Sequence, residues 1–353
     1  MNRPLATHDG AVMPARRARH ASLSAFFASQ SDAELASLVN AGRVSGVGVG
    51  GGSAVLDLNG VPVFTKRIPL AELERAHPRS TANLFELPMF CQYGIGGPGF
   101  NAWRELAANV IVTDGVLSGE TDSFPLLYHW RVLPGRPPVA AEHADIDAVV
   151  AALDHCPAAR VRLEALAAAS CSLVLWCEHI PYPMDSWLRE DPVGKAELVE
   201  RQLAQIVAFL RSRELLHMDG HVGNMRTDGE RIFLTDFGLA TSPRFDLSAA
   251  ERDFVQRHAT HDAGYAAMRL VNWLVTTVCG VPAPATGGPV ARNEYVRQCA
   301  AGHIPADVPP AVAAILTRHA PVAARMNGFY WKLFGGDVHA EYPVCRQAEV
   351  RKQ

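Results

Sequence analysis

The stretch from His217 to Gly238 brings together the side-chain types that phosphoryl transfer requires. Asp219 is followed five residues later by Asn224, and Asp236 lies a further twelve residues along the chain. One carboxylate can orient an acceptor hydroxyl and take its proton, while an amide oxygen and a second carboxylate can hold Mg²⁺ on the phosphates. The pattern therefore favours phosphoryl transfer.

A hairpin is predicted between Asn224 and Asp236. The dipeptide Asp228-Gly229 is typical of a tight turn, and short apolar runs flank it on both sides. A hairpin returns its two ends to one place, so we expect Asn224 and Asp236 to lie side by side.

A second region of interest is rich in glycine and lies upstream, within residues 44–53. It precedes two runs of strand-forming residues, at 54–58 and 61–68, which the turn dipeptide Asn59-Gly60 separates. The predicted order is strand, glycine loop, strand, turn and strand, with Lys66 in the last strand. A glycine-rich turn alone is weak evidence for a phosphate site.

Taken together, these residues resemble the protein-kinase-like superfamily. The similarity spans about residues 46–278, and its strongest part resembles the catalytic loop and DFG motif: His217, Asp219, Asn224, Asp236, Phe237 and Gly238. The resemblance implies an α+β, bilobal fold. Its smaller N-terminal lobe would hold an antiparallel sheet and a helix, and its larger lobe would be mainly helical.

The resemblance implies that Asp219 is the catalytic base and that Asn224 and Asp236 are the Mg²⁺ ligands. It also assigns roles to residues of the smaller lobe. Lys66 would contact the α- and β-phosphates of ATP, and Glu105 would pair with it, although Glu72, Glu74 and Glu86 are alternatives. Backbone groups of the connection between the lobes would bind adenine. The glycine loop has two registers, and the implied ATP-binding set is Gly46, Gly48, Gly50, Gly51, Ser53, Val55, Lys66, Glu105, Glu178 and Ile180.

The two registers place the third small residue of the loop differently. In one, Gly46, Gly48 and Gly51 form a G-x-G-x-x-G pattern. In the other, Gly48 and Gly50 are followed by Ser53.

Three features differ from the usual protein kinase pattern. Met218 stands before Asp219, where an arginine commonly binds a phosphorylated activation segment. We therefore expect the segment after Gly238 to be ordered by packing rather than by phosphorylation. His221, two residues after Asp219, stands where protein kinases usually have a lysine, and a histidine there resembles the aminoglycoside and choline phosphotransferase branch. No A-P-E motif occurs between Gly238 and Asp262.

The expected activity is ATP- and Mg²⁺-dependent transfer of the γ-phosphate to a hydroxyl, with Ser or Thr of a protein as the acceptor. Two alternatives remain. One is a small-molecule phosphotransferase, and the other is a pseudokinase-like binding module. Lys66, Asp219, Asn224 and Asp236 are all present, which argues against the second. We expect His217 and Asp262 to be structural, and His221 to be either structural or a contact of the acceptor or phosphate.

Composition excludes several other classes. The 353 residues include 33 Lys and Arg against 36 Asp and Glu, so the net charge is −3, and nucleic-acid binding through phosphate neutralisation is not expected. Seven cysteines without a C-x-x-C pair oppose a disulfide scaffold and favour a reducing, cytoplasmic setting. No apolar run reaches the ~18–20 residues of a membrane helix.

We expect three segments along the chain. The first segment, residues 1–40, is predicted to hold a mobile tail over residues 1–30 and then a short helix. The Ser31-x-x-Glu34 capping box marks the start of that helix. Residues 41–180 are predicted to form the smaller lobe, with an insertion, and residues 181–353 the helical lobe. Within them, helices are expected from Asn101 to Ile111 and at 144–170, 195–216 and 262–278, and strands at 124–133 and 172–177.

Overall fold

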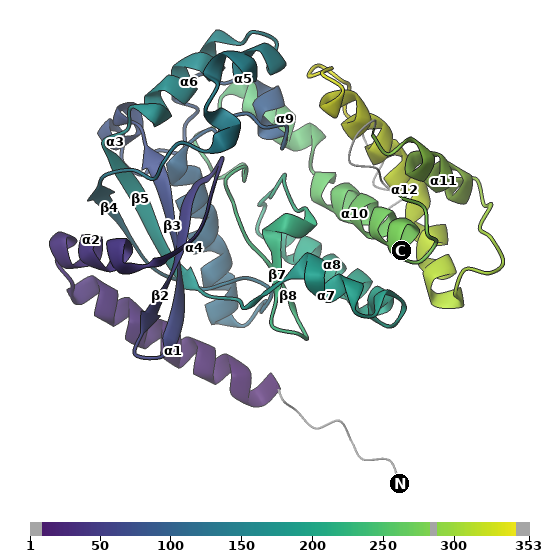
Figure 1. Ribbon diagram of the computed structural model, residues 1–353, viewed down its shortest axis with the longest axis horizontal. Helices are drawn as coiled ribbons and strands as arrows, with labels where there is room; N and C mark the ends of the chain where they lie inside the picture. Colours follow the sequence, from purple (N-terminus) through teal and green to yellow (C-terminus); the bar gives the residue numbers. More distant parts are fainter. Residues whose placement is uncertain (1–8, 283–287, 344–353) are drawn as a thin grey trace.

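The computed structural model describes residues 9–282 and 288–343, and it shows an α+β protein (Figure 1). Its larger sheet is antiparallel, with five strands in the order β1-β2-β3-β5-β4. The strands are β1 (Arg43–Gly48), β2 (Gly51–Leu58), β3 (Val61–Leu70), β4 (Leu127–Pro134) and β5 (Cys171–Glu178). The predicted strands at 54–58, 61–68 and 172–177 are confirmed, and the strand predicted from residue 124 begins at Leu127.

The turn between β2 and β3 is the predicted one. Asn59 and Gly60 both have positive φ, at 56° and 83°, which is the backbone of a type I′ hairpin turn. This turn fixes the register in which Ser53 lies opposite Lys66. The sequence pattern therefore places Lys66 beside the glycine loop.

Three helices pack around the sheet (Figure 1): α1 (Asp9–Ser29), α2 (Asp32–Ala41) and α4 (Ala102–Ser118). The predicted capping box at Ser31 and the predicted cap at Asn101 are both present. The mobile tail predicted for residues 1–30 is wrong over the described part. α1 packs on β4 and buries Phe27, because its apolar residues find a partner at the sheet edge. Residues 1–8 lie outside the described residues.

Two long connections leave the sheet. The first, residues 71–101 between β3 and α4, holds α3 (Glu72–Ala76) and the 3₁₀ helix η1 (Met89–Gln92). The second joins β4 to β5 and holds η2 (Ala141–His143), α5 (Ile146–Ala152) and α6 (Pro157–Ala167). The helix predicted over 144–170 is thus two helices, because Asp154 and His155 adopt positive φ between them.

The rest of the described chain is mainly helical, as predicted (Figure 1). Its helices are α7 (Met184–Arg189), α8 (Pro192–Ser212), α9 (Ala249–Arg257), α10 (His261–Thr277), α11 (Val290–Ala300) and α12 (Pro310–Phe334), with η3 at Val222–Asn224. A small sheet pairs β6 (Tyr182–Pro183), β7 (Met225–Thr227) and β8 (Ile232–Leu234). The predicted hairpin around Asp228-Gly229 is β7–β8.

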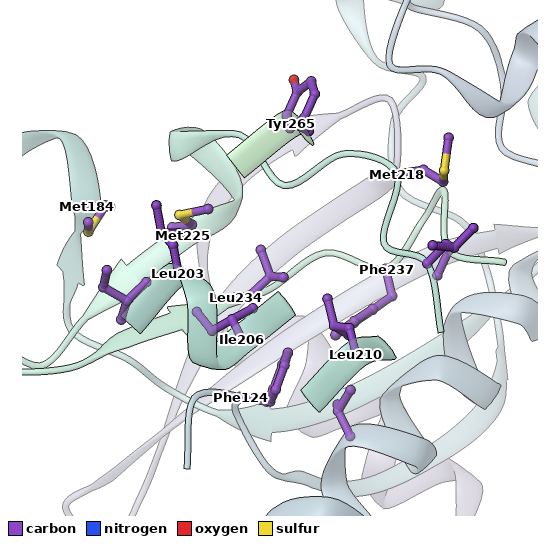
Figure 2. Close-up of a cluster of buried hydrophobic side chains, with 14 of the residues drawn as sticks. Phe124, Met184, Leu203, Ile206, Leu210, Met218, Met225, Leu234, Phe237 and Tyr265 are labelled. Atoms are coloured by element: carbon purple, nitrogen blue, oxygen red, sulfur yellow. The ribbon is translucent and has the colours of Figure 1, made fainter. Parts of the chain in front are cut away.

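The helices of this half bury a core that reaches the β7–β8 hairpin. Figure 2 shows Leu203, Ile206 and Leu210, which recur along one face of α8, in a cluster with Leu234 and Phe237. The spacing of three to four residues is that of an amphipathic helix. Because Phe237 follows Asp236 directly, this cluster also anchors the second candidate metal ligand.

The cysteines and the helices agree with two further expectations. The six described cysteines, Cys91, Cys156, Cys171, Cys177, Cys279 and Cys299, are free thiols, while Cys345 lies outside the described residues. Over the described ranges, no helix is both long and apolar enough to cross a membrane.

Candidate active site

The loop from His217 to Asn224, here called the catalytic loop, is fixed by a carboxylate of α10. Asp262 accepts hydrogen bonds from the amides of His217 and Met218, at 2.7 and 3.0 Å. His217 lies 3.0 Å from the carbonyl of Thr235 through Nε2, and its Nδ1 accepts a bond from the Asp219 amide. His217 and Asp262 are therefore structural, as predicted, although α10 begins at His261 and Asp262 lies in its first turn.

The residue before Asp219 has an unusual backbone. Met218 is fully buried and has a φ of 67°, a region that a bulky non-glycine residue rarely adopts. Its side chain packs into the apolar cluster of Figure 2. Such strain persists only where the surroundings impose it, and it concentrates at functional positions. Met218 thus provides packing where an arginine would provide charge.

The hairpin brings Asn224 beside Asp219 and Asp236. The side-chain amide of Asn224 donates to the Asp219 carbonyl at 2.9 Å and to Asp219 Oδ2 at 3.1 Å. The backbone carbonyl of Asn224 accepts a bond from Thr235, next to Asp236, at 2.8 Å. Because the Asn224 amide nitrogen is used as a donor to Asp219, its side-chain oxygen is oriented away and can serve a cation.

Lys66 connects the sheet to this loop. Its ammonium lies 2.6 Å from Glu105 Oε1 and 2.9 Å from Asp236 Oδ1. Burial opposes the charged form of Lys66, but the carboxylates of Asp236 and Glu105 outweigh it and raise the pKa. Burial likewise opposes the charged form of Asp236, yet the Lys66 ammonium lowers its pKa. Both groups therefore stay charged at neutral pH.

Glu105 is thus the carboxylate that pairs with Lys66, among the four that the sequence offered. Glu74 instead pairs with Arg162 at 2.8 Å, while its side chain also accepts bonds from the amides of Ala71 and Ala102. Glu72 pairs with Arg75 on the surface. The first turn of α4, capped by Asn101, delivers Glu105 to the sheet.

The glycine loop folds over Lys66. Gly48 pairs with Gly51, so the turn consists of Val49 and Gly50, which agrees with the register Gly46, Gly48 and Gly51. A Cβ on Gly50 would lie 3.0 Å from Lys66 Nζ and 3.8 Å from Asp236 Oδ2. Gly51 has a φ of 117°, and a Cβ there would lie 2.1 Å from the Arg67 carbonyl oxygen, so glycine is required.

Ser53 therefore lies within β2 and not at the turn. Its hydroxyl donates a hydrogen bond to the Gly46 carbonyl at 3.2 Å. Val55 lies two residues further along β2, on the sheet face that it shares with Ser53 and Lys66. This face extends from the turn toward the end of β5.

The electrostatics of Asp219 suit a base. Burial and, second, the nearby charge of Asp236 raise the pKa of its carboxyl to about 7, against the opposing effects of the Asn224 hydrogen bond and Arg269. A carboxylate with a pKa near neutrality can accept a proton and later release it. His221 caps η3, where its Nδ1 accepts a bond from the Gly223 amide, and its Nε2 lies 3.6 Å from Asp219 Oδ2.

The end of β5 is held by the N-terminal helix. Glu178 is buried and pairs with Arg16 at 2.6 Å, and its amide donates to the Leu126 carbonyl at 2.8 Å. The carbonyl of Ile180 accepts a bond from Arg226 at 3.1 Å. The Glu178 amide is therefore used within the fold, and the adenine contact that the resemblance gave Glu178 and Ile180 stays a prediction.

A segment without a predicted role covers the catalytic loop. Residues 77–100, here called the cover, pass over Asp219 and Gly238. A Cβ on Gly94 would lie 2.6 Å from Asp219 Oδ1, and one on Gly99 would lie 3.0 Å from the Gly238 carbonyl oxygen. The only sequence signal was a cluster of glycines at 94–99, which indicated a loop but not its position.

The donor set fits Mg²⁺ held together with phosphates. Asn224 supplies an amide oxygen and Asp236 a carboxylate, and Mg²⁺ commonly takes one or two protein ligands plus phosphate oxygens and water. Residues 9–282 and 288–343 hold no cluster of three or more His, Cys, Asp or Glu that could bind a metal by themselves. The site therefore suits a metal that arrives with a nucleotide.

Comparison with models of known protein families finds no match for this chain, and comparison with curated proteins finds none either. The function is therefore inferred from the geometry of the site.

Proposed function

We propose that the protein is an ATP- and Mg²⁺-dependent phosphotransferase with a bilobal, protein-kinase-like fold, and that it transfers the γ-phosphate to a hydroxyl group. One observation carries the proposal. Lys66 bridges Glu105 and Asp236, at 2.6 and 2.9 Å, directly below the glycine turn and next to the hydrogen-bonded pair of Asp219 and Asn224. These five groups come from four separate elements, and phosphoryl transfer uses all of them.

Each residue has a distinct part in the reaction. Lys66 holds the α- and β-phosphates by charge, and Glu105 keeps its ammonium in place. Asn224 and Asp236 would hold Mg²⁺, which neutralises charge on the phosphates when it is bound. Asp219 orients the acceptor hydroxyl and accepts its proton as the oxygen attacks the γ-phosphorus. The donor bond from Asn224 fixes the direction of the Asp219 carboxylate.

The DFG and lysine motifs support Ser or Thr of a protein as one candidate acceptor. A small hydroxyl compound is the other, and the position of Gly94 over Asp219 favours it. A pseudokinase-like module is opposed by the intact set of charged residues.

Calorimetric titration with Mg-ATP, and with ATP in excess EDTA, tests the proposal. Binding should be strong with Mg²⁺ and much weaker without it, and slow ADP release should accompany binding, with water as the acceptor. Equal affinity in both titrations, or no binding, would overturn the proposed function.

A further inference from the structure

The approach to Asp219 is narrow. Its carboxylate has one oxygen, Oδ2, within hydrogen-bond distance of Asn224. The other oxygen, Oδ1, faces Gly94 of the cover, where even a methyl group would lie only 2.6 Å away. The Asp219 side chain is 22% exposed. An acceptor hydroxyl must therefore reach Asp219 beside the cover and cannot displace it without wider changes.

The cover is attached firmly to the helical half of the protein. Tyr93 is buried, its hydroxyl lies 2.5 Å from His258 Nε2, and its ring packs edge-on against Phe329. The Gln92 side chain donates to the carbonyl of Leu239. Two of these contacts reach Leu239 and His258, near the two ends of the segment that follows Gly238, which is where a protein kinase would expose a surface for its protein acceptor.

The start of the cover is attached to the same segment. Thr81 and Asp246 exchange hydrogen bonds, from the Asp246 amide to Thr81 Oγ1 at 2.8 Å and from the Thr81 amide to Asp246 Oδ2 at 3.2 Å. A reciprocal pair of this kind fixes orientation as well as position. The cover therefore crosses the segment at more than one place.

The connection between β4 and β5 holds the cover from its other side. His143 Nε2 lies 2.9 Å from the Gly96 carbonyl, and Arg162 donates to the Gly99 carbonyl at 3.2 Å. A separate apolar cluster joins the two connections: Leu87, Cys91, Phe100, Leu153 and Ala159. Packed on both faces, the cover is a fixed wall and not a loose loop.

We propose that the cover restricts the acceptor site of this phosphotransferase to a small hydroxyl compound, and that it excludes serine and threonine side chains of proteins. A peptide must run past the base on both sides of its hydroxyl residue, and the cover occupies one of those sides. This proposal rests on the proposed function, since it names the acceptor class of the same site.

The charges around Asp219 further limit the chemical class of the acceptor. Besides Asp236, which pairs with Lys66, the charged group that acts on Asp219 most clearly is Arg269 of α10. Arg269 lies over the ring of Tyr265, at 5.9 Å, and the described residues give it no carboxylate partner. A site with this cation suits an uncharged or anionic acceptor, such as a polyol or a sugar acid, better than a cationic one.

Acceptor class is tested on the full chain with radiolabelled ATP. One arm supplies casein and a mixture of Ser- and Thr-containing peptides, and the other supplies glycerol, ribose, gluconate, choline and kanamycin, with ADP release followed in parallel. We expect glycerol, ribose or gluconate to stimulate ADP release, and protein or peptide to remain unlabelled. Labelling of Ser or Thr, or transfer only to choline or kanamycin, would overturn the proposal while leaving the phosphotransferase intact. Absence of Mg-ATP binding would overturn both.

The role of the cover itself is tested with two glycine variants. Gly94→Ala should lower transfer by about 100-fold, because the methyl group must shift Asp219 or the cover. Gly97→Ala is the matched control, since a Cβ there meets Leu153 and Cys91 at ordinary distances of 3.5–3.8 Å. Mg-ATP affinity should be unchanged in both variants. A Gly94→Ala variant that is as active as Gly97→Ala, or that gains activity toward peptides, would overturn the proposal.

Discussion

The catalytic loop and the cover meet across Asp219, and apolar packing contributes more to the second than to the first. Directed hydrogen bonds to Asp262 and Asn224 fix the loop within a few residues of the base. The cover is held by buried aromatic and aliphatic side chains such as Tyr93 and Leu87, together with hydrogen bonds to distant parts of the chain such as Asp246. Hydrogen bonds fix direction, which a proton transfer needs, while packing excludes volume, which selects an acceptor. The two regions therefore control different steps.

This difference predicts different consequences of mutation. Changes in the loop should alter turnover with little effect on stability, because each net hydrogen bond contributes only about 1 kcal/mol to folding. Changes under the cover should alter stability or acceptor access, because they leave cavities or unpaired buried groups.

The largest effect is expected at the base. Asp219→Asn retains the shape of the side chain but cannot accept the proton of the acceptor, so turnover should fall by roughly 10²- to 10⁴-fold. Mg-ATP affinity and the melting temperature should remain near those of the wild type. Asp228→Asn, in the exposed turn of the β7–β8 hairpin, is the matched control. Near-normal transfer by Asp219→Asn would show that another group is the base.

The next largest effect is expected at the proposed Mg²⁺ site. Asp236→Ala removes one proposed Mg²⁺ ligand and leaves Lys66 paired with Glu105 alone. Transfer should be abolished, and Mg-ATP affinity should fall by at least about tenfold, or about 1.4 kcal/mol. Calorimetry with and without Mg²⁺ measures this change. If Mg²⁺ still strengthened ATP binding to the same extent, the metal would lie elsewhere.

A smaller effect is expected under the cover, and it depends on pH. His258 is buried and neutral: Nδ1 lies 2.7 Å from the Phe254 carbonyl, and Nε2 faces the Tyr93 hydroxyl. Burial lowers the pKa of His258 to about 3. Between this value and the ordinary pKa of about 6.5, the unfolded chain binds more protons than the folded one. The free energy of unfolding should therefore fall as the pH falls below about 6.5, by up to about 1.4 kcal/mol per pH unit.

Urea unfolding at pH 7.5, 5.5 and 4.5 measures this slope. His258→Gln should reduce it, whereas the same substitution at the exposed His303 should leave it unchanged. An equal slope in wild type and His258→Gln would show that other groups carry the acid sensitivity.

The loop was predictable from the sequence and the cover was not, for a physical reason. Asp219, Asn224 and Asp236 are close in the chain, and the turn dipeptide between them determines how they meet. Asn59-Gly60 and the caps at Ser31 and Asn101 are likewise local signals.

The contacts of the cover and of α1 join positions far apart in the chain. Arg16 and Glu178 are 162 residues apart, and neither carries a local signal for the other. Gly94 is similar, because its place over Asp219 depends on packing against two other connections. The spacing of residues in a sequence predicts helices, strands and turns. It does not predict which long connection will pack over which loop.

No effect at all is expected from removal of phosphate groups. Met218 is apolar and buried where an arginine would bind a phosphorylated segment. Buried side chains instead hold the segment from Gly238 to His261 in place. Phe245, Leu247 and Phe254 are buried, which agrees with an order that depends on packing. The Thr241 and Ser242 side chains are also buried, and Ser248 caps α9. These three hydroxyls are therefore buried or used in a helix cap.

Phosphatase treatment, with dephosphorylation confirmed by mass spectrometry, tests this expectation directly. The rate of ADP release, measured with whichever acceptor the radiolabel experiment identifies, should stay the same, because Met218 offers no charged partner for a phosphate group. A large loss of activity, restored by rephosphorylation within residues 239–261, would mean that the segment is a switch. The cover would then have to move with it, and Thr81 and Asp246, which join the two, would be the place to look for that movement.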